Sequence, residues 1–165
     1  MADEHTLGAE LVTPESALFA GEAVAVVCRT SEGDLTVLAG HTQLVGDLVP
    51  GVVRIELAEG STLSFCVHGG FLQVDTSLGA AVGLIEGAAP ADRTTRVTLL
   101  AGVAEPVSAI DVARAQASRD AAAAVLASLA AREDEEARLD REQAQRSLAR
   151  AELRLEVTGA TATSQ

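Results

Sequence analysis

The sequence predicts a two-part protein of the β + α class: an N-terminal antiparallel β-sandwich or barrel followed by a C-terminal antiparallel hairpin of two helices. Apolar and polar residues alternate at 53–57 and at 62–67 around a Glu59-Gly60 turn, a pattern typical of a β-hairpin with one wet face. Other short apolar runs recur at spacings of roughly ten residues, as in antiparallel sandwiches. From residue 108 to about 157 the chain has neither Gly nor Pro and is rich in helix formers, which predicts helix.

Several strands are predicted in the first part of the chain, each bounded by turn residues. The first ends at Pro14, and the run at 24–28 suits a strand covered on both faces. Residues 40–47 are bracketed by glycines and are predicted to form a loop. The segment 77–91, rich in Gly and Ala, fits an extended hairpin or a mobile loop. The predicted strands are 7–13, 24–28, 35–38, 53–57, 62–67, 71–75 and 97–100.

The helical tail begins at Ser108, which with Asp111 three residues later resembles a capping box. Each helix has a stripe of mostly small residues, which predicts close packing of the two helices. The four consecutive acids at 133–136 repel one another and mark the expected hinge. A single straight helix of about 50 residues is the alternative, because no breaker is present and alanine stripes bury little area. The stripes are Ala113, Ala117, Ala121, Ala124 and Ser128, and Ala137, Ala144, Leu148, Ala151 and Leu155.

Composition excludes several classes of function. The formal net charge is −12, and the part up to residue 110 holds 14 acidic against four basic groups (−10), which disfavours nucleic-acid binding. The His and Cys residues lack the spacing of a zinc site, and we find no catalytic constellation or phosphate loop. No signal peptide or membrane-spanning run is recognised. We therefore expect a soluble, cytosolic, metal-free and non-enzymatic protein, with Cys28 and Cys66 as reduced thiols.

Three stretches, in order along the chain, carry a family resemblance. The first is S-E-G-D-L-T-V-L-A-G-H-T-Q-L-V at 31–45, closing on L-V-P-G at 48–51. The second is V-H-G-G-F at 67–71, and the third is the segment 99–104 leading into I-D-V-A-R-A at 110–115. Together they resemble the epsilon subunit of the rotary (F-type) ATP synthase, bacterial type, over roughly residues 7–157. The segment 77–92 departs from the family pattern and resembles an insertion between two late strands.

The resemblance implies a fold and a role for each part. Residues 1–106 would form a sandwich of about ten strands that binds the gamma subunit and the ring of c subunits. Residues 107–157 would form a regulatory helical hairpin, and 158–165 a disordered tail. The whole would be a non-catalytic rotor subunit of the central stalk of a proton-translocating ATP synthase. It would be peripheral on the cytoplasmic face of the cell membrane, associated only through the complex.

The resemblance also implies regulation by the helices. Folded as a hairpin they would permit ATP hydrolysis, and extended they would contact the alpha/beta catalytic head and inhibit it. A regulatory ATP, with no other cofactor, would bind the hairpin, although Ala121 stands where ATP-binding members carry another arginine. The alternative is that the charged residues of this implied site are solvated helix charges, with the arginines paired with Glu152, Glu156 and Asp111. The implied nucleotide-binding residues are Ile110, Asp111, Arg114 and Ala115, with Arg150 and Arg154 on the second helix.

Partner contacts to the c ring or gamma are predicted at Glu32, Asp34 and His41, on loops expected at one end of the sandwich. By resemblance, the loop with Glu32 and Asp34 faces the c ring. The alternative is ordinary turn chemistry at Asp34 and a hydrogen-bonded loop histidine at His41.

A different class of function is also compatible with the sequence. The chain would then be a stand-alone β-sandwich binding module that oligomerises through its helical hairpin. Purification from membranes separates the two hypotheses, since a rotor subunit co-elutes with large subunits and the module elutes as a soluble homo-oligomer.

Overall fold

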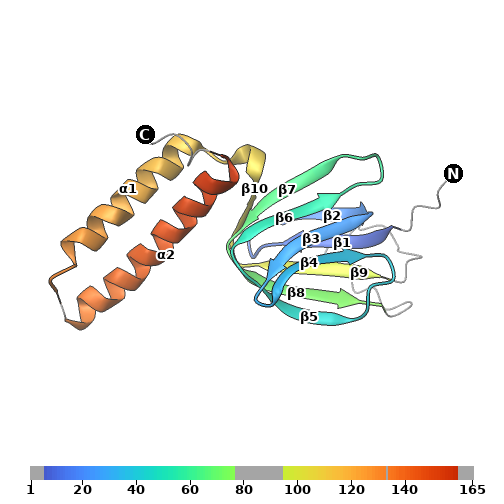
Figure 1. Cartoon of the computed structure of the whole chain (residues 1–165), viewed down its shortest axis with the longest axis horizontal. Helices are drawn as coiled ribbons and strands as arrows, with labels where there is room; N and C mark the ends of the chain where they lie inside the picture. Colours follow the sequence, from blue (N-terminus) through green and yellow to red (C-terminus); the bar gives the residue numbers. More distant parts are fainter. Residues whose placement is uncertain (1–5, 77–94, 133, 160–165) are drawn as a thin grey trace. The chain divides into compact units, whose positions relative to one another are not determined.

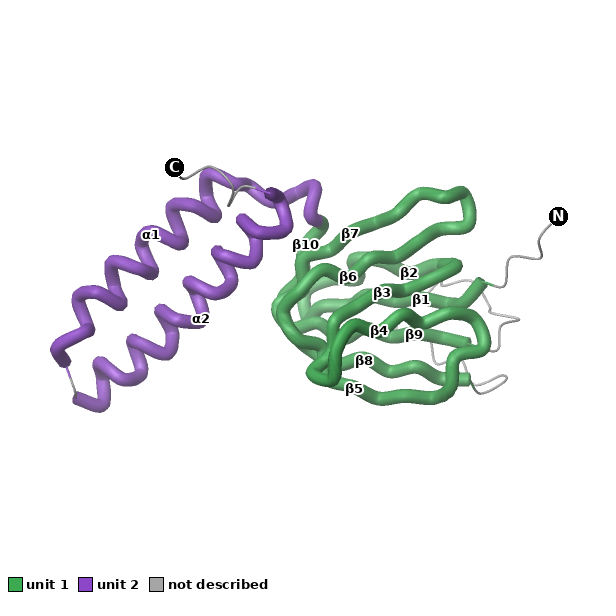
Figure 2. Tube along the Cα trace, in the orientation of Figure 1, with its two compact units in different colours: residues 1–106 green, residues 107–165 purple. Residues whose placement is uncertain are grey.

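The structure, a computed structural model, describes residues 6–76, 95–132 and 134–159. The chain divides into two compact units, residues 1–106 and residues 107–165 (Figure 2). Strands form the first unit and helices the second (Figure 1). The predicted insertion at 77–92 lies outside the described residues.

Ten strands form the described part of the first unit, which confirms the predicted sandwich. Nine of them follow the hydrogen-bonded order β10-β7-β6-β3-β5-β8-β9-β1-β2, and β4 pairs with β3 off this path. The β1–β9 pair is parallel, whereas the other pairs are antiparallel. The strands are β1 (Leu7–Val12), β2 (Ala17–Ala23), β3 (Ala25–Thr30), β4 (Gly33–Leu38), β5 (Leu44–Leu48), β6 (Gly51–Glu56), β7 (Thr62–Val67), β8 (Gly70–Asp75), β9 (Arg96–Ala101) and β10 (Ala104–Pro106).

One hydrophobic core joins strands that are far apart in this order. Ile55 of β6 and Phe65 of β7 belong to the same buried cluster as Leu72 of β8, Leu99 of β9 and Leu11 of β1. A flat sheet would hold these side chains several strand spacings apart, at about 4.8 Å for each strand. The sheet therefore folds over on itself, and its inner faces form the core (Figure 1).

The alternation at 53–57 has the predicted orientation, with Val53 and Ile55 buried and Arg54 exposed. The prediction of one wet face is wrong at the end of β7, because Cys66 is buried as well as Phe65. The imidazole of His68 lies on the same face as Cys66, with its Nε2 3.7 Å from the Cys66 Sγ. The His68 ring therefore contributes to the cover of Cys66 on the second face of β7.

Three strands were not predicted. Strand β2 is rich in small residues without alternation, and β10 is a three-residue strand that ends at Pro106. The loop predicted at 40–47 is wrong, because residues 44–48 form β5 and pair with β8 from Leu44↔Val74 to Leu48↔Gly70. That pairing depends on a partner more than twenty positions along the chain, which local composition cannot reveal.

An ion pair fastens β1 to β9 on the face away from the core. Arg96 Nη1 donates to Glu10 Oε1 at 2.7 Å, and their side chains are 18% and 3% exposed. Burying a carboxylate is costly unless it is paired and hydrogen-bonded. The β1–β9 register that places Gly8 beside Arg96 therefore also provides the Glu10 carboxylate with its charged hydrogen-bond donor.

The second unit is an antiparallel pair of helices, as predicted (Figure 1). A short 3₁₀ turn, η1 (Val107–Ala109), precedes α1 (Val112–Ser128) and α2 (Glu135–Val157). Helix α2 ends in a cap in which the Thr158 hydroxyl donates to the Arg154 carbonyl at 2.9 Å, followed by Gly159 at φ +72°. Of the tail predicted to be disordered, these two residues belong to the helix end, and 160–165 lie outside the described residues.

The predicted packing stripe is right for α2 and wrong for α1. In α2, Ala137, Ala144, Ala151 and Leu155 are buried and Leu148 is half-buried. In α1, the five residues of the predicted stripe are all exposed, and the buried positions are Ala115, Ala122 and the following Leu129. Alanines lie on every side of α1, so spacing alone does not identify the stripe that α2 covers.

Gly70, in the V-H-G-G-F motif, is required by its backbone geometry. Its φ is +151°, and a Cβ built there would overlap the Leu100 carbonyl and lie 2.9 Å from the Ala101 Cα. Both obstacles are backbone atoms of the neighbouring strand β9, which cannot rotate away as a side chain can. Glycine is therefore the residue that allows β8 to approach β9 at this point.

We predict that Gly70→Ala lowers the free energy of unfolding by about 1–3 kcal/mol, the usual cost of a strained backbone conformation. Urea denaturation followed by far-UV circular dichroism measures the change. Gly102→Ala is the matched control, because a Cβ at Gly102 meets nothing within 4 Å and its φ is not positive. Equal midpoints for the two variants would contradict the assignment.

Candidate functional site

The first candidate site lies at the start of α1. Asp111 has extended backbone angles (φ −82°, ψ 104°), and its Oδ1 accepts a hydrogen bond from the Arg114 amide at 3.0 Å. Asp111 is thus the N-cap, and the prediction that Ser108 caps the helix is wrong. Ser108 lies inside η1, whose turn closes with the Ile110 amide donating to the Val107 carbonyl at 3.3 Å. The 3₁₀ turn moves the helix start three residues along, where Asp serves as well as Ser.

The motif residues have distinct environments. Asp111 and Arg114 are joined through a carboxylate–amide bond, and the Arg114 side chain is exposed. Ala115 is buried, and its amide donates to the Asp111 carbonyl at 2.9 Å in the first turn of the helix. Ile110 is half-buried. The motif therefore combines a cap, a packing position and one exposed guanidinium.

The predicted second-helix residues lie on the last turns of α2. Arg150 is exposed and Arg154 is half-buried, and their four-residue spacing places them on one face. Because α1 and α2 are antiparallel, this end of α2 lies at the same end of the hairpin as Asp111 and Arg114 (Figure 1). The fold thus brings the predicted arginines to one end of the hairpin, where the positive end of the α1 dipole and the negative end of the α2 dipole lie together.

The second candidate site is the turn between β3 and β4. Gly33 has φ +129°, and the Thr30 hydroxyl closes the turn by donating to the Gly33 carbonyl at 2.9 Å. This turn displays Glu32 and Asp34 to solvent. The ion pair between Arg29 and Asp34, at 3.5 Å, is highly exposed and contributes little.

A cleft of about 310 Å³ lies between this turn and β5, and it adds a residue that the sequence did not indicate. Its lining includes Glu32, Asp34 and also Asp47. The Ser31 amide donates to the Asp47 carbonyl at 3.1 Å, which holds the turn against β5. Asp47 was missed because β5 was predicted to be loop. These three residues are called the acidic cleft below.

His41 does not belong to the acidic cleft, so the prediction that it shares one end with Glu32 and Asp34 is wrong. Strand β4 separates them. Asp34 is the second residue of this strand, and His41 lies beyond its last residue, Leu38. Six strand residues span about 20 Å. The His41 Nδ1 contacts the Thr42 carbonyl oxygen at 2.7 Å, so this half-buried ring is hydrogen-bonded within its own loop.

An apolar patch lies on the outer face of β5, β8 and β9. Phe71 and Leu100 are directly paired across the strands and are 59% and 44% exposed. Val45, on the same face of β5, is 74% exposed. The sequence signal is the period-two alternation of strand side chains: because Leu72 and Val74 are buried in the core, Phe71 faces outward. These three side chains are called the apolar patch below.

The described residues contain no group of three or more His, Cys, Asp or Glu side chains placed to hold a metal ion. Both cysteines are buried and form no disulfide. Burial, and then the negative charge of Asp34, raise the pKa of the Cys28 thiol to about 11, so it is protonated at neutral pH. No described helix is long and apolar enough to span a membrane.

Comparison with known proteins identifies the class of the first unit. The family model of the ATP synthase delta/epsilon chain β-sandwich domain matches residues 6–78. The chain belongs to the family of ATP synthase epsilon chains, as the sequence resemblance predicted.

Two relatives and one solved structure illustrate this membership. The ATP synthase epsilon chain of Desulforudis audaxviator is 37% identical over 119 residues, 72% of this chain and 73% of the relative. That of Streptomyces griseus is 36% identical over 110 residues, 67% of this chain and 74% of the relative. A chain in the cryo-EM structure of the Euglena gracilis mitochondrial ATP synthase (OSCP/F1/c-ring) has the same fold, with a TM-score of 0.60 and 22% identity over 95% of this chain and 79% of that chain.

We predict that Asp111→Ala destabilises the helical unit by about 1 kcal/mol, the usual value of an N-cap side chain. Thermal unfolding of the full chain followed at 222 nm measures the effect. Asp120→Ala is the control, because Asp120 is an exposed α1 residue that pairs with the adjacent Arg119 and caps nothing. Equal losses of helix stability in the two variants would refute the cap assignment.

Proposed function

We propose that this chain is a rotor subunit in the central stalk of a proton-translocating ATP synthase, where it couples rotation of the c ring to the catalytic head. Its membership of the epsilon-chain family is the observation that carries the proposal. The chain itself performs no bond chemistry. It lies on the cytoplasmic face of the cell membrane as a peripheral subunit, held there by its partners. Family membership favours this role over a stand-alone binding module.

The sandwich binds its partners through two adjoining surfaces of different chemistry: Val45 of the apolar patch also lines the cleft, and Asp47 of the cleft pairs with Phe71 across β5 and β8. The apolar patch suits a protein partner, since a cross-strand Phe71–Leu100 pair left in water costs free energy that a covering surface recovers. We assign it to the gamma subunit. The acidic cleft suits basic groups, and we assign it to the polar loops of the c ring. His41 contributes to the rotor contact from the other end of β4, through its loop.

The helical unit regulates hydrolysis in this proposal. As a hairpin it permits ATP hydrolysis, and when extended it contacts the alpha/beta head and inhibits. ATP binds the hairpin end, where Arg114, Arg150 and Arg154 offer guanidinium groups to phosphates. The other contacts come from Asp111, Ile110 and Ala115. Because these residues come together only when the helices are folded, ATP stabilises the hairpin by mass action.

We predict that ATP binds the isolated full chain with a measurable heat in calorimetric titration, and that Arg114→Ala and Arg150→Ala each weaken binding by about tenfold or more. Arg146→Ala is the control, since Arg146 is an exposed α2 arginine paired with Glu142 within its own helix. No heat at millimolar ATP, or the same loss in the control, would remove ATP from the proposed function.

Reversing charge in the acidic cleft should weaken coupling to the ring. In Asp34→Lys and Asp47→Lys, a basic partner meets a like charge, and we expect proton-driven ATP synthesis in membrane vesicles to fall by about tenfold or more. Glu59→Lys reverses another exposed acid, which lies in the β6–β7 turn outside the cleft, and should leave synthesis unchanged. Full synthesis in both cleft variants would contradict the assignment.

A further inference from the structure

The turn between α1 and α2 is held by side chains and not by a helix-breaking residue. Helix α1 ends at Ser128, with Leu129 as its C-cap, and α2 starts after its N-cap Asp134. No Gly or Pro occurs between the two helices. The local sequence is therefore compatible with a continuous helix, and the interactions that favour the turn have to come from elsewhere.

Arg141, in the second turn of α2, reaches back to the end of α1. Its Nη2 donates to the carbonyls of Leu129 and Arg132, both at 2.8 Å. Carbonyls at a helix C-terminus lack intrahelical partners, and the helix dipole makes this end negative. The Leu129 carbonyl also accepts from the Arg132 amide at 3.1 Å, so the guanidinium adds a second donor there. Arg141 also binds the Arg132 carbonyl beyond the helix end, and its positive charge lies near the negative end of the α1 dipole.

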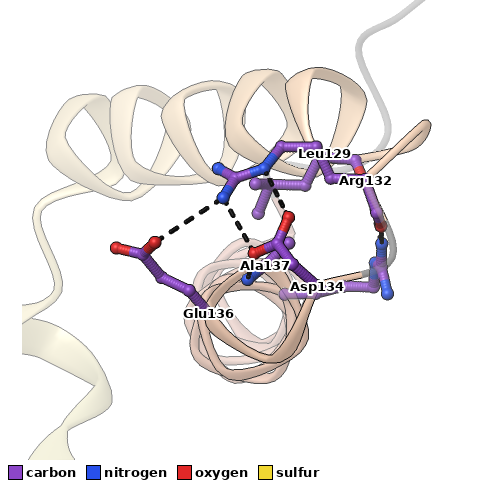
Figure 3. A network of polar contacts seen from close by, with 6 residues as sticks. Leu129, Arg132, Asp134, Glu136 and Ala137 are labelled. Atoms are coloured by element: carbon purple, nitrogen blue, oxygen red, sulfur yellow. Dashed lines mark hydrogen bonds and ion pairs between the residues drawn. The ribbon is translucent and has the colours of Figure 1, made fainter.

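Asp134 performs two tasks in the same turn (Figure 3). Its Oδ1 accepts from the Ala137 amide at 2.9 Å, which caps α2, and its two oxygens accept from the Arg132 guanidinium at 2.9 and 3.0 Å. The hydrogen bond from the Ala137 amide, and then that from Arg132, lower the pKa of the Asp134 carboxyl. The bond between Arg132 and Asp134 also raises the pKa of the Arg132 guanidinium. Both groups therefore keep their charges and their fork geometry across the neutral range.

These contacts exist in only one arrangement of the helices. In a straight helix, Leu129 and Arg141 are twelve positions and about 18 Å apart, beyond the reach of an arginine side chain. Arg132 and Asp134 are two positions apart, so they would point to different sides of a straight helix. An N-cap needs extended backbone angles, which Asp134 would also lose.

Other ion pairs of the region do not discriminate between the two arrangements. Arg132–Glu136 and Arg146–Glu142 are spaced i,i+4, and Arg138–Glu135 is spaced i,i+3. Such pairs form equally well in a continuous helix. The packing between the helices does discriminate, but it consists largely of alanine and releases little apolar area from water.

We propose that Arg132, Asp134 and Arg141 form a clasp that selects the hairpin over a continuous helix. The inference rests on the proposed function in one respect: the tail must have an extended arrangement that competes with the hairpin. An equilibrium shifts only through interactions that differ between its states, and these three residues supply such a difference. The sequence marks the acidic run at 133–136 as the weakest point of the tail. Asp134 belongs to this run, and it is one of the three residues that hold the helices as a hairpin.

The test is a distance measurement on the full chain with spin labels at Ser118→Cys and Ala149→Cys, two exposed positions. In the hairpin the labels lie on neighbouring helices, about 10 Å apart between axes. In a straight helix they lie about 46 Å apart. The native cysteines are buried, and a chain without the introduced cysteines checks that they remain unlabelled.

We expect Arg141→Ala to raise the ratio of extended to hairpin forms by about tenfold or more, because hydrogen bonds to charged groups are the stronger ones. Arg141→Lys, which keeps donors and charge, should recover part of the loss. Arg146→Ala is the matched control and should leave the ratio unchanged. If the extended form of the single variant is too rare to detect, the triple variant Arg132→Ala, Asp134→Ala and Arg141→Ala decides the matter. A triple variant that stays wholly in the hairpin would overturn the clasp.

Two further readouts separate the possible failures. Far-UV circular dichroism must show retained helix, because loss of helix with a broad distance distribution would mean that the clasp residues hold the helices folded and do not select between arrangements. Hydrolysis by the reconstituted complex is measured in parallel. Variants that open the hairpin without changing hydrolysis would leave the clasp intact and refute the regulatory role, whereas unchanged distances would refute the clasp itself.

Discussion

The parallel pairing of β1 with β9 is the constraint on which the sandwich depends. In the strand order, β1 and β2 are attached to the rest of the sheet only through β9. The pairing sets Leu11 beside Leu99 in the core and brings Arg96 to the carboxylate of Glu10, 86 positions away in the sequence. A buried carboxylate allows few alternatives, because a shifted register would leave it unpaired. The Gly8 amide extends the ladder by donating to the Thr95 carbonyl at 3.0 Å.

The two units differ in the kind of packing that holds them together. The sandwich buries Leu, Ile, Val and Phe side chains in one cluster, which specifies a single arrangement of its strands. The helical unit buries mainly alanines, which contribute much less free energy per residue. Polar contacts at the helix ends therefore carry a larger share of what holds the hairpin. This difference accords with the proposed division into a rigid rotor contact and a tail with two arrangements.

Sequence reasoning succeeded where the determining interaction is local. The alternation of Val53 and Ile55 with Arg54 depends only on strand geometry, and the helical tail depends on residue propensities. It failed where distant residues decide. Residues 44–48 become a strand because β8 pairs with them, and that pairing also brings Asp47 to the acidic cleft. His41 and Asp34 are near in sequence, but the extended strand β4 carries the chain from one end of the sandwich to the other between them.

The sequence by itself determined the family, the order of strands before helices, and the residues that an antiparallel hairpin brings to one end. Only the tertiary structure decided which alanine stripe of α1 is buried, that Asp111 and not Ser108 begins the helix, and that Arg141 closes the turn. The physical reason is that periodicity and propensity describe one segment at a time. Ala122 and Ala121 have the same side chain, and only the position of α2 makes one of them core and the other surface.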